Sequence, residues 1–314
     1  RRPPRSTLFP YTTLFRSPQK LSLLFITLII ITVTIIAIYI NKKSRRELRN
    51  MAARQYEIQQ LMETKLVAFA IEKYFDRFIS DLYSVVNASQ GLFVTPPSDE
   101  FFYERHKGLQ KATSIRFIDT QGILTFIYPT EGFRRHLIGK RYDREGYYRK
   151  AITTGKIAIS SFLYNEKKEP RIRIAIPVFE NDPVTSSIKG ILVGSFDPIT
   201  VLNTIIDPIV LEKAVEYAWV LDAEGHFLLH PVKEFEGKNS FGIREERNPA
   251  FSYEKIEKIQ QKMIQGHEGT DTYLSGWHRN QKGCIEKFVA YSPVKIADSN
   301  WSLAICSPKN VLDT

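Results

Sequence analysis

The chain has 314 residues, of which 43% are hydrophobic and 25% are charged. That composition is typical of a folded protein, and the length leaves room for two modest domains. The net charge of +10 lies entirely in residues 1–54, which hold eleven Lys or Arg and one acid, whereas the remaining residues hold 33 of each sign. Because a nucleic-acid-binding domain carries its positive charge on the folded part, we expect no nucleic-acid partner.

The first seventeen residues end in the segment "RSTLFPYTTLFRS", which repeats Thr-Leu-Phe within a few positions. This segment resembles a translated sequencing adapter, a contaminant found at the ends of assembled gene fragments. Residues 1–17 are therefore expected to be an artefact. Their basic side chains then carry no information about the orientation of the chain in a membrane.

Residues 21–40, "LSLLFITLIIITVTIIAIYI", contain no charged side chain. A helix of this length, rising 1.5 Å per residue, is long enough to cross a hydrocarbon core. A signal-peptide core is shorter and precedes a small-residue cleavage site, which does not occur before Asn41. We therefore predict a transmembrane helix over 21–40. The basic residues that follow this helix would by themselves place the C-terminal domain in the cytoplasm. Long domains are, however, translocated with little regard for such charges.

A long helix is predicted over 41–92, because Gly and Pro are absent from this stretch until its end. Apolar residues recur there at spacings of three and four: Ile58, Leu61, Met62, Leu66, Phe69, Phe75, Phe78, Ile79, Leu82 and Val85. Such an amphipathic pattern is typical of a stalk that packs on its own domain and on a second copy. Two shorter helices would give the same pattern.

One phrase occurs twice in the chain, as "FIDTQGILTFIYP" over 117–129 and as "VLDAEGHFLLHP" over 220–231. Each copy places Asp-x-x-Gly between two apolar runs. The Asp side chain favours a tight turn and Gly accepts the positive φ that such turns need, so each copy predicts a β-hairpin. The spacing of the copies indicates a duplicated unit of domain size.

Strand-length apolar runs follow in two groups, which predict one unit over 93–207 and a second over 208–308. Within the first, "RIRIAIPV" alternates Arg with Ile, the pattern of a half-buried strand. Helices are expected from Pro198 and over 253–264. The predicted fold class is therefore α+β, with two tandem units built on antiparallel sheets.

Six phrases carry a resemblance to a known family: "IRFIDTQGILTFIYP", "IGKRYDREGYYRKAI", "RIRIAIPVFE", "KGILVGSFDPITVL", "AWVLDAEGHFLLHP" and "FVAYSPVKIADSNWSLAICSP". They span about Leu48 to Pro308, and in this order the chain resembles the double Cache sensor domains of bacterial transmembrane receptors. The resemblance implies a PAS-like fold for each unit, the first lying farther from the membrane. Residues 309–314 would then begin the connection to a second membrane helix.

The resemblance also implies a ligand pocket in the first unit, and five residues are predicted to line it: Arg144, Tyr147, Tyr148, Arg173 and Asp197. A guanidinium suits a carboxylate, the tyrosines offer a ring wall and a hydroxyl, and Asp197 would take an amino group. The segment departs from the Arg-x-Trp-Tyr of the family's amino-acid sensors, since it reads Arg-Glu-Gly-Tyr-Tyr. The alternative is that Arg144 lies on the surface, one Tyr is core and Asp197 caps a helix.

The function expected from the resemblance is an extracytoplasmic sensory module of a bacterial inner-membrane receptor, which binds an organic acid, amino acid or amine and performs no chemistry. Its output domain would be a histidine kinase, a diguanylate cyclase or a chemoreceptor signalling domain. A homodimer is expected. The alternative is a ligand-free module that dimerises or binds a periplasmic protein.

The sequence offers little support for a metal or cofactor. His226 and His230 share strand parity, but two histidines without nearby Cys or carboxylate ligands make a weak metal site, so neither a metal nor another cofactor is expected. Cys284 and Cys306 flank runs that would pair in a hairpin. They form either a disulfide or two unpaired thiols.

Overall fold

The computed structural model describes residues 18–88, 112–130, 132–165, 167–180, 187–210, 216–247, 251–278 and 281–310. The adapter-like residues 1–17 and the last residues, 311–314, lie outside these ranges. The chain divides into two compact units, Arg1–Tyr56 and Glu57–Thr314. Each unit is described by itself below.

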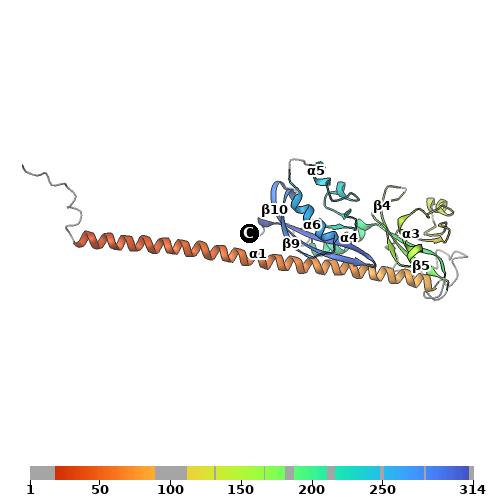
Figure 1. Ribbon diagram of the computed structural model, residues 1–314, viewed down its shortest axis with the longest axis horizontal. Coiled ribbons are helices and arrows are strands. Elements are labelled where there is room, and N and C mark those ends of the chain that lie inside the picture. The colour runs from red at the N-terminus through yellow and green to blue at the C-terminus, as the bar shows by residue number, and fades with distance from the viewer. Residues whose placement is uncertain are drawn as a thin grey trace, which may run out of the picture. The chain divides into compact units, whose positions relative to one another are not determined.

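The first unit contains the N-terminal part of helix α1 (Pro18–Ala88), shown in red and orange in Figure 1. Within the described residues, α1 is the one helix long and apolar enough to cross a membrane. The hydroxyls of Thr27, Thr32 and Thr34 each donate to the carbonyl four residues earlier at 2.8 Å. Because these hydroxyls are satisfied within the helix, they add little cost to placing the segment in hydrocarbon. The stretch predicted as a stalk is one helix as far as Ala88, rather than two.

The second unit holds two antiparallel sheets, as predicted. Sheet I has the strand order β2-β1-β6-β5-β3, with β4 also paired to β5. Its strands are β1 (Ser114–Asp119), β2 (Leu124–Tyr128), β3 (Ala158–Ile159), β4 (Leu163–Tyr164), β5 (Pro170–Phe179) and β6 (Ile188–Phe196). Sheet II has the order β8-β7-β11-β10-β9. Its strands are β7 (Tyr217–Leu221), β8 (Phe227–Leu229), β9 (Gly269–His278), β10 (Gln281–Ile296) and β11 (Ser299–Pro308).

The remaining described helices are shorter than α1. They are η3 (Gly132–Leu137), α3 (Gly146–Thr154), α4 (Pro198–Val210), η4 (Lys233–Phe235), α5 (Ile243–Arg247) and α6 (Glu254–Ile264). Among them, α4 shares the apolar core of α1. Helix α3 packs on β5 and β6 of sheet I, and α6 packs on β9, β10 and β11 of sheet II. Helix α4 contacts β5 in sheet I and β7 and β8 in sheet II, and it lies between the two sheets in Figure 1.

One continuous apolar core joins α1 to both sheets. Strand β5 turns Ile172, Ile174 and Ile176 toward this core and Arg173 to the other face, as its alternation predicts. At the middle of the core, the ring of Phe75 lies 5.0 Å from that of Phe196 in sheet I and 5.3 Å from that of Trp301 in sheet II. The two sheets therefore share a core through α1.

Polar contacts also fasten α1 to sheet II. The side-chain amide of Gln60 donates to the Ser307 hydroxyl at 3.0 Å, and both residues are buried. The carboxylate of Glu72 accepts the backbone N–H of Lys295 at 2.7 Å. The second unit therefore begins with residues of α1, and its last strand, β11, contacts this helix.

The repeated phrase forms the same hairpin in each sheet. Asp119 accepts the backbone N–H groups of Gln121 and Ile123 at 2.9 and 2.8 Å. Asp222 accepts those of Glu224 and His226 at the same distances. The glycines of the two turns have φ of +79° and +85°. A Cβ at Gly122 would lie 2.6 Å from the Cβ of Asp143, so this turn requires Gly for space as well as for conformation.

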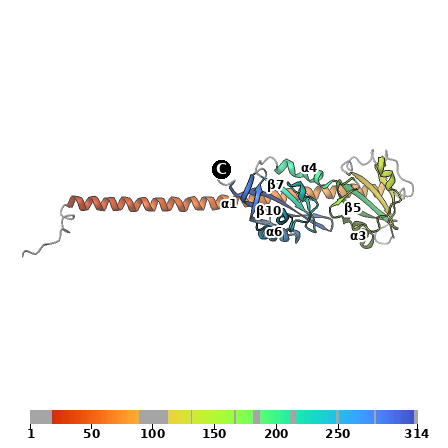
Figure 2. The same cartoon turned by 90° about the horizontal axis from the view of Figure 1, so that it is seen from above.

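The two sheets also meet directly through the segment that follows β3. Ser161 donates to the Glu224 carboxylate at 2.6 Å. A Cβ at Gly237 would lie 2.8 Å from the ring of Phe162, so the backbone that follows η4 comes close to that ring. The side-by-side arrangement of the two sheets is visible in Figure 2.

Candidate functional site

Strand alternation gathers polar side chains on the α3 face of sheet I. Strand β1 places Ser114 and Arg116 there, β6 places Ser195, and β5 places Arg173. The register sets Ser195 opposite both Ser114 on β1 and Arg173 on β5. All four side chains are buried, which is unusual for Arg unless its donors are satisfied.

The turn before α3 and the helix itself bring further groups to this face. Tyr142 precedes the turn, Glu145 is the N-cap residue of α3, and Tyr147 lies in its first turn. We refer to the following set as the arginine cluster: Ser114, Arg116, Tyr142, Glu145, Tyr147, Arg173 and Ser195. Arg116 donates from Nε to the Ser114 hydroxyl and from Nη1 to the Tyr142 hydroxyl, both at 3.3 Å.

Arg173 has an incomplete set of partners. Its Nη1 lies 3.2 Å from the Tyr147 hydroxyl and 3.5 Å from the Glu145 carboxylate, and its guanidinium sits 5.3 Å from the centre of the Tyr147 ring. Its Nε is buried without a hydrogen-bond partner, and so is the Ser195 hydroxyl. An unsatisfied buried polar group costs about 1–3 kcal/mol, so these atoms are open positions for a ligand acceptor.

The electrostatics of the arginine cluster favour an anion. It holds two buried guanidinium groups and one carboxylate, Glu145, which is about one-third exposed. Burial raises the pKa of Tyr147 to about 12, although the neighbouring Arg173 opposes this shift. The phenol is therefore protonated at neutral pH and able to donate. A planar carboxylate matches the fork of donors that a guanidinium presents.

The structure brings together two of the five residues predicted from sequence, Tyr147 and Arg173. Tyr148 is buried, but its hydroxyl donates to the Asp119 carbonyl at 2.8 Å and so fixes α3 on the first hairpin. Arg144 is exposed. The carboxylate of Asp197 accepts the N–H groups of Ile199 and Thr200 at 3.0 and 3.3 Å, which makes it the cap of α4.

Five members of the arginine cluster were not predicted from the sequence: Ser114, Arg116, Tyr142, Glu145 and Ser195. The signal for Arg116 was present, because "SIRFID" places a charged residue inside an otherwise apolar strand, as "RIRIAIPV" does. Ser195 carries no such signal. Ser195 belongs to the cluster because β6 lies between β1 and β5, and local sequence does not predict the order of strands in a sheet.

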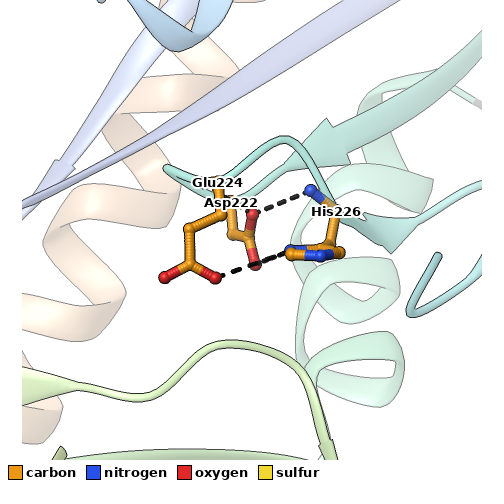
Figure 3. Close-up of side chains that lie close together, drawn as sticks. All are labelled: Asp222, Glu224 and His226. Carbon is orange, nitrogen blue, oxygen red and sulfur yellow. Dashed lines mark hydrogen bonds and ion pairs between the residues drawn. The ribbon is translucent and has the colours of Figure 1, made fainter. Parts of the chain in front are cut away.

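A second group of ionisable side chains lies on the hairpin of sheet II (Figure 3). One ligand atom each of Asp222, Glu224 and His226 lies within 4.8 Å of the others, an arrangement that could hold a metal ion. His226 Nδ1 is 3.3 Å from Asp222 and 3.7 Å from Glu224. The expectation that His226 has no nearby carboxylate ligands is wrong, because the tight turn folds both acids back beside the ring. Asp222 and Glu224 are already engaged by the turn and by Ser161.

The α6 face of sheet II buries a lysine among aromatic rings. Lys287 is fully buried, donates to the Tyr217 hydroxyl at 2.7 Å, and lies 4.4 Å from the centre of the Trp277 ring. Burial lowers its pKa to about 8. Nearby, Cys306 accepts the indole N–H of Trp219 at 3.1 Å. Cys306 is buried, Cys284 is exposed, and both are free thiols, so of the two alternatives the structure shows unpaired thiols.

The fold consists of two antiparallel sheets that share an apolar core with one long helix, and sheet I buries polar side chains on its α3 face. The Cache domain model matches residues 44–313, so the chain belongs to the Cache domain family in its double form. Comparison with curated proteins finds no match.

Three solved structures illustrate the likeness. The extracellular ligand binding receptor from Desulfohalobium retbaense has a TM-score of 0.60 at 18% identity, covering 79% of this chain and 40% of that one. The ligand-binding domain of the Pseudomonas fluorescens chemoreceptor CtaA with L-isoleucine has a TM-score of 0.59 at 16% identity, covering 85% and 98%. The periplasmic sensory domain of the Campylobacter jejuni chemoreceptor Tlp1 gives 0.56 at 16%, covering 83% and 98%. At these identities the likeness shows the fold alone.

Proposed function

We propose that the chain is the extracytoplasmic ligand-binding module of a membrane signal-transduction receptor, and that it binds a small carboxylate-bearing metabolite at the arginine cluster. The observation that carries this proposal is the buried Arg173, whose Nε has no partner beside an equally unsatisfied Ser195 hydroxyl. Membership of the Cache domain family and the single candidate membrane span in the described residues support it. The residues present bind and perform no chemistry.

The side chains of this chain favour a narrower class of ligand than the organic acids, amino acids and amines that the family resemblance implies. Several structurally similar chemoreceptor domains are in complex with amino acids, among them L-Arg, L-Gln and L-Ile. In this chain the acid predicted to take an amino group, Asp197, caps α4 instead. The acid that does lie in the arginine cluster, Glu145, is paired with Arg173. We therefore favour an organic acid over an α-amino acid. A histidine kinase, a diguanylate cyclase and a chemoreceptor signalling domain all fit as output.

The test is a thermal-shift screen of organic acids, amino acids and amines on the full chain in detergent micelles, because a ligand that binds the native state raises its midpoint. Removing Arg173 as Arg173→Met should weaken the best hit by roughly 1.5–3 kcal/mol, the value of a charged hydrogen bond. Tyr147→Phe, which keeps the ring, should cost about 0.5–1.5 kcal/mol. Arg149→Ala on the exposed side of α3 is the control and should bind normally.

Two outcomes would count against the proposal. Full affinity in a folded Arg173→Met chain would place the site elsewhere, and Arg144→Ala and Asp197→Ala then decide whether the positions predicted from sequence hold the ligand. A screen without any hit would favour the alternative of a ligand-free module that dimerises or binds a periplasmic protein.

We also propose a homodimer through α1. Ile58, Met62, Leu66 and Phe69 follow one another at spacings of four, four and three, and each is more than half exposed. Such a stripe on one side of a helix is the seam of a two-stranded coiled coil. Met62→Glu should shift the chain toward monomer in light scattering, whereas Gln59→Glu on an exposed polar position should not. An unchanged mass for Met62→Glu would refute this seam.

A further inference from the structure

A cavity of about 800 Å³ lies between α4 and sheet II, away from the arginine cluster. Helix α4 contributes Ile206, Asp207 and Val210 to its wall, and β8 with the following turn contributes His230 and Glu236. Trp277 of β9 and Leu229 of β8 add apolar surface. Cavities of this size hold metabolites in other proteins, and such sites typically combine apolar walls with a few polar groups.

The two acids of this cavity are not ion-paired in the described residues, although Glu236 accepts the backbone N–H of His230 and is influenced by the charge of Lys233. Asp207 and Glu236 are both partly buried. Burial raises the pKa of both carboxyls, that of Glu236 to about 7. The two cations of the lining, Lys233 and Arg247, are exposed at its edge, and Arg247 lies 5.6 Å from the centre of the Phe235 ring. The partly buried charges of the cavity are thus negative.

His230 adds a directed donor to the same cavity. It is 3% exposed, and its Nδ1 accepts the backbone N–H of Val232 at 3.0 Å. Burial lowers its pKa well below 6.5, with Arg244 acting in the same direction, so the ring is neutral. A neutral ring that accepts at Nδ1 carries its proton on Nε2. In the described part of the chain, no hydrogen bond reaches this Nε2.

We propose that this cavity is a second small-molecule site, which takes an organic ammonium compound. Asp207 and Glu236 hold the ammonium group, the Nε2–H of His230 donates to an acceptor on the ligand, and Ile206, Val210 and Leu229 pack on its apolar body. A compound bound there touches both α4, which begins directly after β6, and sheet II. The site therefore responds to the packing between the two sheets, and it does not depend on the proposal for the arginine cluster.

The first experiment uses 2-phenylethylammonium as the probe, with 2-phenylethanol and 3-phenylpropionate as uncharged and anionic controls. Binding to the full chain in lipid nanodiscs is measured by calorimetric titration. The ammonium compound should bind at least tenfold more tightly than either control. Equal affinity for the alcohol, tighter binding of the carboxylate, or no binding of the ammonium compound at millimolar concentration would overturn the proposal.

Isosteric variants locate the binding. Asp207→Asn and Glu236→Gln should each weaken the probe about tenfold, because each removes one charge without changing the volume of the cavity. Glu234→Gln, an exposed neighbour on η4, should leave binding unchanged. Undiminished binding in the Asp207→Asn/Glu236→Gln double variant, with the circular dichroism of the parent chain, would overturn the assignment. Arg173→Met should bind the probe normally, so failure at the arginine cluster is distinguishable from failure here.

The pH dependence of probe affinity tests whether Glu236 acts through its charge, because a purely structural role of Glu236 would not change this dependence. Glu236 is charged above pH 7, so probe affinity should rise from pH 6 to pH 8 and should stay flat in Glu236→Gln. The other groups that face Glu236 are Asp197, Asp207, His230, Lys233 and Arg247. Of these, His230 is already neutral in this range. A pH profile shared by both chains would contradict the role of Glu236.

Discussion

Replacing Phe75 by Ala should destabilise both sheets at once. The ring is fully buried and lies between Phe196 of sheet I and Trp301 of sheet II, at centroid distances of 5.0 and 5.3 Å. Truncating a buried Phe to Ala lowers the free energy of unfolding by about 3–5 kcal/mol. Each aromatic pair that is lost accounts for roughly 0.5–1.5 kcal/mol of this total. With a urea m-value of about 2.5 kcal/mol/M, the midpoint should fall by roughly 1–2 M.

Two probes of urea unfolding test this shared core. Trp219, Trp277 and Trp301 all lie in sheet II, so their fluorescence reports on that sheet, whereas far-UV circular dichroism reports on both. We expect the two transitions to coincide in the parent chain and to shift together in Phe75→Ala. Tyr83→Ala, at a partly exposed position of α1, should cost less than half as much. Separate transitions, or a loss below about 1 kcal/mol, would refute the idea of one core.

Three further predictions follow from particular side chains. Because the pKa of Lys287 is about 8 in the folded chain and 10.5 is its ordinary value, the unfolded chain binds more protons between them. Lys287 should therefore increase the free energy of unfolding as the pH rises from 8 to 10. Thermal melts at several pH values should show this increase in the parent chain and not in Lys287→Met. Asp197→Ala should cost about 1 kcal/mol in chemical unfolding, because it removes the cap of α4; no loss would contradict the cap. In a thiol-reagent assay Cys284 should react in the native chain and Cys306 only after unfolding, whereas two reactive thiols would contradict the burial of Cys306.

The parts of the fold that local sequence determines were predictable. Both hairpins follow from an Asp that accepts two backbone N–H groups and a Gly with positive φ, and these features need no distant partner. The burial of alternate residues in β5 follows from its Arg-Ile pattern in the same way.

The candidate site was predictable only in part, because it depends on which strands become neighbours. Arg173 and Arg116 share a face through β6, and only the order β1-β6-β5 brings them near Tyr147. For Asp197, the sequence allowed both a ligand role and a cap. The decision depends on where α4 begins, one residue later. The cavity behind α4 carried no sequence signal, because its acids, Asp207 and Glu236, come from separate segments.

The hydrogen bond between Gln60 and Ser307 limits how far α1 can slide along sheet II. It is 3.0 Å long, and a helix advances 1.5 Å for each residue, so a slip of one residue takes the donor out of bonding range. Both groups are buried, and losing the bond there costs about 1–3 kcal/mol. Displacements of a few tenths of an ångström are therefore absorbed elastically, while larger ones require the contact to break. At this contact the resistance to sliding is therefore highest just before the hydrogen bond breaks and falls once it is lost.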